Sequence, residues 1–196
     1  MTERSHFALV VPNHTVRWYA EGEHCTDPQN CDIILVDHGT VASTLVEDAE
    51  KLGTIREPEL RPYTWCGHAG VIRTGLASSI GPMVSEMGFR GYERRPLETY
   101  RARRYAVVSL WAVREQRLAA AKFDDAMQGA DYGWLEYPAM AVDDVFGTQL
   151  AVSESDHVVC SAHTMLVASA LGFFGDRLAI RTEPMRIAMW LDVKPN

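Results

Sequence analysis

Residues 156–172, DHVVCSAHTMLVASALG, carry the clearest structural pattern in the chain. The β-branched residues Val158 and Val159 lead into Cys160. Apolar side chains then recur at helical spacing, at Ala162, Leu166, Ala170 and Phe173. This spacing predicts an amphipathic helix that begins at or just after Cys160 and stops at Gly172.

A cysteine at the start of a helix lies in an environment that favours its ionised form. The first backbone N–H groups of a helix have no intrahelical partners, and the positive end of the helix dipole is found there. Both features stabilise the thiolate, which is the nucleophilic form of cysteine. Taken alone, however, Cys160 fits a buried structural cysteine better, because free cysteine behaves as a small apolar residue. A catalytic role therefore depends on a base and an orienting group elsewhere in the chain.

The composition predicts a single globular domain over residues 1–196. Of the 196 residues, 47% are apolar, which is enough for a substantial core. The net charge of −7 argues against a nucleic-acid-binding protein. No apolar run approaches the length of a membrane-spanning helix, and residues 1–6 are not followed by the apolar region of a signal peptide. We therefore expect a protein without an export signal or a membrane span, located in the cytoplasm or in a virion.

The four cysteines do not form the pattern of a disulfide framework in a chain of this length. Cys25 and Cys31 enclose a loop that could close a bridge in an oxidising compartment, but without an export signal free thiols are favoured. Their spacing differs from that of zinc-binding pairs, and no second Cys/His pair follows at the required distance. We expect no metal and no cofactor.

The remaining sequence predicts alternating strands and helices. Strands are expected over 31–37, 63–75, 83–87 and 105–110, and helices over 41–52, 113–129 and 182–191. Residues 7–19 supply an edge strand or an arm, and Pro58 and Pro62 indicate a loop. Gly88 and Gly91 indicate a hairpin turn. The order predicts an α+β domain.

Two of the predicted strands carry residues that complement a cysteine nucleophile. His68 lies on the strand over 63–75, and Glu86 lies on the strand that follows. Adjacent strands are roughly 5 Å apart, so Glu86 can reach a ring on the neighbouring strand. A carboxylate there would hold the imidazole and favour its protonated form, and so an ion pair with a thiolate. Individually, His68 fits a core histidine and Glu86 a solvent-facing residue; their order with Cys160 favours a shared site.

Four short segments resemble the circularly permuted NlpC/P60 (papain-like) proteins. They are 31–36 (CDIILV), 68–72 (HAGVI), 84–86 with 91–94 (VSE and GYER) and 159–163 (VCSAH). In that family the histidine strand precedes the cysteine helix, the reverse of the usual papain order. Lecithin–retinol acyltransferase-like enzymes and YiiX-type hydrolases share this permutation. The resemblance covers roughly residues 31–172 and implies an antiparallel sheet packed against the cysteine-bearing helix.

The resemblance also implies roles for individual residues. Cys160 is the expected nucleophile, His68 the base and Glu86 the orienting residue. Tyr132, in the segment GADY, matches a Gly-x-x-Tyr signature that lines the cleft in the family. Where the family commonly has Glu or Gln after the Cys-Ser pair, this chain has Ala-His, which makes His163 a secondary candidate for substrate binding.

By the same resemblance, the expected reaction is hydrolysis of an amide bond through a thioester at Cys160. Family members act on peptidoglycan peptides, other amides or lipid acyl groups, so the substrate is a peptide or an acyl compound. The alternative is a non-catalytic structural or interaction module of the same fold, within a larger assembly such as a phage particle. A virion component would also bring a thiol peptidase without an export signal to the cell wall.

Two further features have more than one interpretation. Cys66 lies two residues before His68, so we expect both on one face of the strand, where Cys66 is a candidate redox partner. A basic stretch contains five arginines, at 94, 95, 101, 103 and 104. It fits a solvated surface better than recognition of an anionic substrate.

Overall fold

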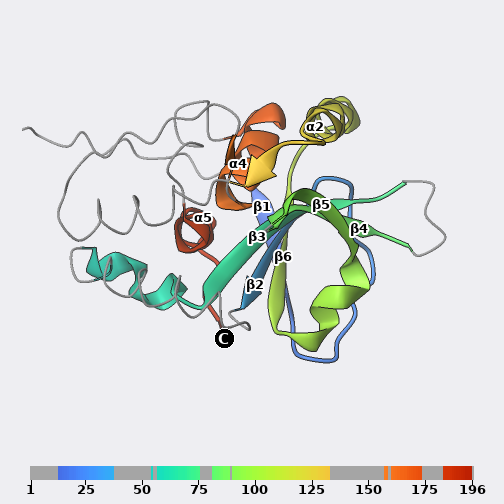
Figure 1. Ribbon diagram of the computed structural model, residues 1–196. Helices are drawn as coiled ribbons and strands as arrows, with labels where there is room; N and C mark the ends of the chain where they lie inside the picture. The colour runs from blue at the N-terminus through green and yellow to red at the C-terminus, as the bar shows by residue number, and fades with distance from the viewer. Residues whose placement is uncertain are drawn as a thin grey trace, which may run out of the picture.

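The computed structural model describes residues 13–37, 54, 57–75, 81–88, 90–132, 157–158, 160–173 and 183–195. At its centre is a six-stranded antiparallel sheet with the strand order β1-β6-β2-β3-β4-β5 (Figure 1). The strands are β1 (His14–Tyr19), β2 (Ile33–Asp37), β3 (Cys66–Arg73), β4 (Met83–Gly88), β5 (Gly91–Pro96) and β6 (Tyr105–Leu110). The fold is α+β, as predicted.

The helices that accompany the sheet are short. The α-helices are α2 (Arg114–Ala126), α4 (Cys160–Ala170) and α5 (Pro184–Trp190), and the 3-10 helices are η1 (Pro58–Tyr63) and η2 (Leu97–Ala102). A separate two-stranded parallel pair joins β7 (Asp131–Tyr132) to β8 (His157–Val158). Strand β8 ends two residues before α4 begins.

The two faces of the sheet are buried under different helices. Alternate residues of a strand point to opposite faces. Ile33 and Leu35 belong to a core that includes residues of α4, α5 and η1, whereas Ile34 and Val36 belong to a second core with Leu97 of η2. Figure 1 shows α4 and α5 on one side of the sheet and η2 on the other. Burial on both faces explains the uninterrupted apolar run in β2.

Helix α4 begins at Cys160, as predicted, but the prediction of an amphipathic helix is wrong. Its first six residues, Cys160 to Met165, are all buried, and so are Val167 and Ala168. The reason is its place in the fold, because α4 packs against β3, β4, α2 and α5. A helix with neighbours on several sides has apolar residues around most of its surface.

Most of the other predicted elements occur in the structure. Strands β2 and β6 confirm the predictions for 31–37 and 105–110, and β1 is an edge strand. The hairpin is confirmed by the pairing of Gly88 with Gly91, whose φ of +92° favours glycine. The expected loop around Pro58 and Pro62 is instead the 3-10 helix η1, which also takes Tyr63 from the predicted strand. The helix predicted over 41–52 lies outside the described residues.

A β-bulge determines which way His68 points. In the pairing of β2 with β3, Val36 lies opposite His68, but Asp37 lies opposite Cys66. Gly67 is therefore the extra residue, and the usual alternation is interrupted there. Because paired residues share a face, His68 points to the same face as Val36, and Cys66 points to the other. The expectation that Cys66 and His68 share a face is thus wrong.

Candidate active site

His68 and Glu86 are in direct contact. Nε2 of His68 lies 2.5 Å from Oε2 of Glu86. Their strands, β3 and β4, pair from Arg73 opposite Met83 to Val71 opposite Ser85, and His68 lies beyond the last of these pairs. Glu86 is the residue after Ser85, so the strand alternation turns its side chain to the face that His68 occupies.

Three groups surround the Glu86 carboxylate, whose side chain is 4% exposed. Besides His68, the hydroxyl of Tyr100 donates a hydrogen bond to Oε2, and Nε of Arg95 lies 3.2 Å from Oε1. Burial alone would raise the pKa of Glu86. The His68 ring, the Tyr100 hydroxyl and the Arg95 guanidinium outweigh burial and hold that pKa below its usual value. Glu86 is therefore ionised at neutral pH.

Cys160 reaches the same histidine from α4. Its thiol is hydrogen-bonded to the His68 side chain, so the ring contacts both Cys160 and Glu86. Burial would lower the pKa of His68. The negative charges of Cys160 and Glu86, and the hydrogen bonds to both, outweigh that effect and raise the pKa of His68 from 6.5 to about 10. The arrangement favours an imidazolium between two anions. Cys160 is 2% exposed and the His68 side chain 25% exposed, so the ring is the more open part of the group.

The backbone of Tyr132 lies close to the start of α4. Strand β7 pairs with β8 so that Tyr132 is opposite Val158, two residues before Cys160. Strand β7 also lies against β4 and β5, and Ala130 accepts a hydrogen bond from the backbone N–H of Tyr92. The side chain of Tyr132 lies outside the described residues, so its role in lining a cleft stays a prediction.

The structure places His163 apart from His68, in a second polar cluster. His163 is fully buried, and its Nε2 lies 2.8 Å from Oδ1 of Asp124 in α2. The ring also meets the ring of Tyr92 edge-on, with centroids 5.7 Å apart. Within the described residues, Nδ1 of His163 and Oγ of Ser161 are buried without a hydrogen-bond partner. With no exposed surface, His163 offers no side-chain atom to a substrate in this conformation.

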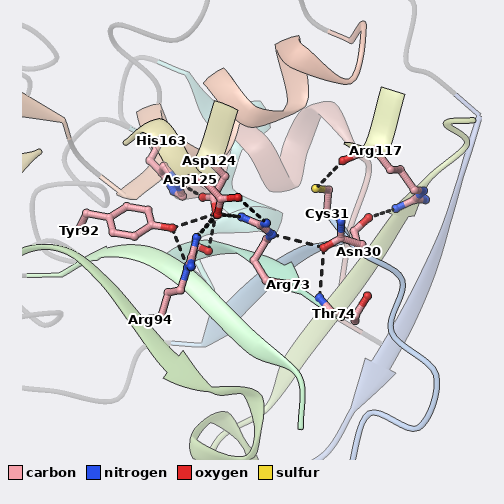
Figure 2. A network of polar contacts seen from close by, with 11 residues as sticks. Asn30, Cys31, Arg73, Thr74, Tyr92, Arg94, Arg117, Asp124, Asp125 and His163 are labelled. Atoms are coloured by element: carbon pink, nitrogen blue, oxygen red, sulfur yellow. Dashed lines mark hydrogen bonds and ion pairs between the residues drawn. The ribbon is translucent and has the colours of Figure 1, made fainter. Parts of the chain in front are cut away.

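Asp124 lies at the centre of that second cluster (Figure 2). Its carboxylate contacts His163, Arg73, Arg94, Ser85 and Tyr92. Figure 2 shows Tyr92 and His163 on one side of the carboxylate and Arg73 on the other. Burial would raise the pKa of Asp124, but His163, Ser85 and Arg73 together hold it well below its usual range. The cluster joins α2, α4, β3, β4 and β5 through one buried charge.

Asp124 and Tyr100 were not among the residues predicted from the sequence. A signal for Asp124 was present, because it lies four residues after Ala120 and three after Ala121, on the buried face of α2. An acidic residue on that face indicates a buried partner. No pattern in the sequence indicates that Tyr100 would reach Glu86, since η2 was not predicted.

The basic stretch is largely neutralised within the fold. Ion pairs join Arg94 to Asp124 and Asp125, Arg95 to Glu86 and Glu93, Arg101 to Glu98, and Arg104 to Asp37. Four of the five arginines therefore have carboxylate partners in the same chain. This favours a structural role for the stretch over recognition of an anionic substrate.

Within the described part of the chain, no three His, Cys, Asp or Glu side chains are grouped so as to hold a metal ion. In the same residues, no helix has the length and apolar character needed to cross a membrane. Neither a protein-family model nor a curated protein sequence matches this chain. The contacts among Cys160, His68 and Glu86 are therefore the main guide to its function.

Proposed function

We propose that the protein is a cysteine hydrolase that cleaves an amide bond through a thioester at Cys160. One observation carries the proposal: the His68 ring is hydrogen-bonded to the Cys160 thiol and to the Glu86 carboxylate. The three residues come from α4, β3 and β4. A base that contacts both a nucleophile and an orienting group is what covalent catalysis by cysteine requires.

The two ring nitrogens of His68 have separate tasks in this proposal. Nε2 faces Glu86, which leaves Nδ1 for exchange of a proton with the sulfur of Cys160. In the resting enzyme the ring is an imidazolium and Cys160 is a thiolate. Glu86 stays ionised throughout and fixes the orientation of the ring.

In the first half of the reaction, the sulfur of Cys160 attacks the carbonyl carbon of the amide. A C–S bond forms, and the carbonyl π electrons move onto oxygen, near the backbone N–H groups of the first turn of α4. As the tetrahedral intermediate collapses, the C–N bond breaks and His68 gives its proton to the leaving amine. The product is a thioester on Cys160 and a neutral His68.

In the second half, water is the nucleophile. His68 takes a proton from water while the oxygen attacks the thioester carbonyl, and the C–S bond breaks with departure of the Cys160 thiolate. The imidazolium and thiolate are restored. The sum of both halves is one amide and one water converted into a carboxylic acid and an amine.

The resemblance to permuted NlpC/P60 proteins extends the proposal to the substrate and its setting. We infer a peptide amide, with peptidoglycan peptides as the first class to examine, and a phage particle as a setting in which such an enzyme acts. The same thioester chemistry also serves transfer of lipid acyl groups, so ester substrates belong in the same comparison.

The experiment is alkylation with iodoacetamide near pH 6, followed by mass spectrometry of each cysteine. Because the imidazolium of His68 stabilises a thiolate, Cys160 should react at least about tenfold faster than Cys25. His68→Ala should remove this advantage, and Cys160→Ala should remove the fast-reacting site.

The matched control is His24→Ala, since His24 also pairs with a glutamate, Glu98 at 2.8 Å, but on the surface. It should leave the Cys160 rate unchanged. Equal rates for Cys160 and Cys25 in the wild-type protein would contradict the proposal and favour a non-catalytic structural module.

A further inference from the structure

Two residues outside the predicted site contact Glu86 directly, Arg95 and Tyr100. We propose that Arg95 and Tyr100 are positioning residues that keep Glu86 ionised and directed at His68, and that they set the acid limit of the pH range in which Cys160 is reactive. This inference rests on the proposed function, because it concerns the group that orients His68.

The contacts divide the two carboxylate oxygens of Glu86 between different partners. Oε2 accepts a hydrogen bond from the hydroxyl of Tyr100 and contacts Nε2 of His68 at 2.5 Å. Oε1 faces Nε of Arg95 at 3.2 Å. Rotation of the carboxylate would break contacts at both oxygens at once. The side chain is therefore held in the one orientation that serves His68.

Arg95 also offsets the repulsion between two glutamates that lie opposite each other in the sheet. In the pairing of β4 with β5, Glu86 lies directly opposite Glu93, and like charges in that position destabilise a sheet. Arg95 is two residues beyond Glu93 and so on the same face. Its guanidinium contacts both carboxylates, at 3.2 Å from Glu86 and 2.6 Å from Glu93. Arg95 thereby offsets the negative charge of Glu93, which would otherwise favour protonation of Glu86.

Tyr100 stabilises the Glu86 carboxylate by donating a hydrogen bond from its hydroxyl. The residue is 7% exposed, and burial together with the adjacent Glu86 raises the pKa of its hydroxyl far above the usual value. The Tyr100 hydroxyl therefore keeps its proton, and remains a hydrogen-bond donor, between pH 4 and pH 8. A donor of this kind stabilises the ionised carboxylate of Glu86 more than the protonated acid.

The charged and titratable groups that face Glu86 come from three neighbouring elements. They are His68 of β3, Arg95 and Glu93 of β5, and Tyr100 of η2, with Cys160 of α4 acting through His68. Removal of the Arg95 charge or the Tyr100 hydroxyl should raise the pKa of Glu86. Protonated Glu86 cannot support the imidazolium of His68, so the reactivity of Cys160 should then fail at a higher pH than in the wild-type protein.

The experiment measures the iodoacetamide rate of Cys160 between about pH 4 and pH 8 in the wild-type protein, Tyr100→Phe and Arg95→Gln. We expect the acid midpoint of each variant to move up by about half a pH unit or more, with at least a threefold lower rate near pH 5. As the pH rises, the rate of each variant should approach the wild-type rate. Arg95→Lys, which keeps the charge, should return the midpoint toward that of the wild-type protein.

Two control variants make the same chemical changes away from Glu86. Tyr105→Phe removes a hydroxyl that donates to the backbone oxygen of Glu23, and Arg101→Gln breaks a surface pair with Glu98. Both should keep the wild-type midpoint. A reactive wild-type Cys160 with unchanged midpoints in Tyr100→Phe and Arg95→Gln would overturn this inference alone. A rate lowered equally at every pH would also overturn it, since that is the effect of a structural role. An unreactive wild-type Cys160 would instead overturn the proposed function.

Discussion

Two buried carboxylates among the described residues, Glu86 and Asp124, each pair with a histidine, and the two groups are built from the same kinds of side chain. Each carboxylate contacts one histidine, one tyrosine hydroxyl and at least one arginine. For Glu86 these are His68, Tyr100 and Arg95, and for Asp124 they are His163, Tyr92, Arg94 and Arg73. Strands β4 and β5 contribute to both groups, because the neighbours Ser85 and Glu86, like Arg94 and Arg95, point to opposite faces of the sheet.

The two pairs differ in exposure and in what the histidine contacts next. His163 and Asp124 are both fully buried. The His68 side chain is 25% exposed, and its ring contacts the thiol of Cys160. A histidine–carboxylate contact therefore does not by itself indicate catalysis. The contact between His163 and Asp124 joins helices to strands, whereas His68 contacts both Glu86 and the thiol of Cys160.

The largest effect is expected from removal of the buried carboxylate. Asp124→Ala leaves Arg73, whose side chain is 4% exposed, without its closest partner, and it removes the hydrogen bond to His163. Loss of one member of a buried pair lowers the free energy of unfolding by about 3–5 kcal/mol. Denaturant unfolding followed by fluorescence measures this change.

The matched control is the adjacent residue, Asp125, whose half-exposed side chain also contacts Arg73 and Arg94. Asp125→Ala should lower the free energy of unfolding by no more than about 1 kcal/mol, because solvent screens its ion pairs with the two arginines. The difference in the free energy of unfolding between the wild-type protein and Asp124→Ala should also become smaller at acid pH. A carboxyl with a lowered pKa stabilises the fold above its ordinary pKa of 3.8, and this contribution is lost as the pH falls toward the lowered value. Equal losses for the two variants would remove the contrast between a buried and an exposed carboxylate.

A smaller effect, on reactivity rather than on folding, is expected at the other carboxylate. Glu86→Gln keeps the size of the side chain but removes the charge that supports the His68 imidazolium. The alkylation rate of Cys160 near pH 6 should fall by at least about tenfold, and turnover of any amide that the wild-type protein cleaves by about 10²-fold. A melting curve must show that the variant is folded. A folded variant with the wild-type rate would show that Glu86 does not orient His68.

A smaller effect is expected on the pKa of His68, and it tests the contact between His68 and Cys160. In the wild-type protein, the ring resonances should titrate with a midpoint of about 10. In Cys160→Ala the midpoint should be lower, because one of the two negative charges that raise the pKa is gone. A histidine with a raised pKa stabilises the fold fully below its ordinary pKa of 6.5 and loses that contribution as the pH rises through about 10. The same midpoint in both proteins would contradict the contact.

The smallest change in reactivity is expected from His163→Asn. His163 faces Asp124, and asparagine retains an N–H donor for that carboxylate. At a temperature at which the variant is folded, its Cys160 alkylation rate should stay within about twofold of the wild-type rate. A loss larger than that of Glu86→Gln would reverse the assignment and make His163 the residue that assists Cys160.

Local patterns in the sequence predicted much of the fold. The apolar run of β2, the β-branched residues of β6 and the glycine turn between β4 and β5 each produced the expected element. These predictions succeeded because strand alternation, β propensity and turn geometry depend on residues close together in the chain. The amphipathic character expected of α4 failed for the opposite reason, since burial depends on what packs around a helix.

For the candidate site, the sequence by itself placed Cys160 at the start of a helix and put His68 and Glu86 on consecutive strands. Which carboxylate His163 meets, and which face of the sheet Cys66 occupies, depended instead on the tertiary structure. A single bulge at Gly67 separates His68 from Cys66, and the partner of His163 comes from α2, 39 residues earlier in the chain. Tyr100 likewise reaches Glu86 from η2. Such pairings depend on how separate elements pack, and the short-range periodicity of a sequence carries no information about that packing.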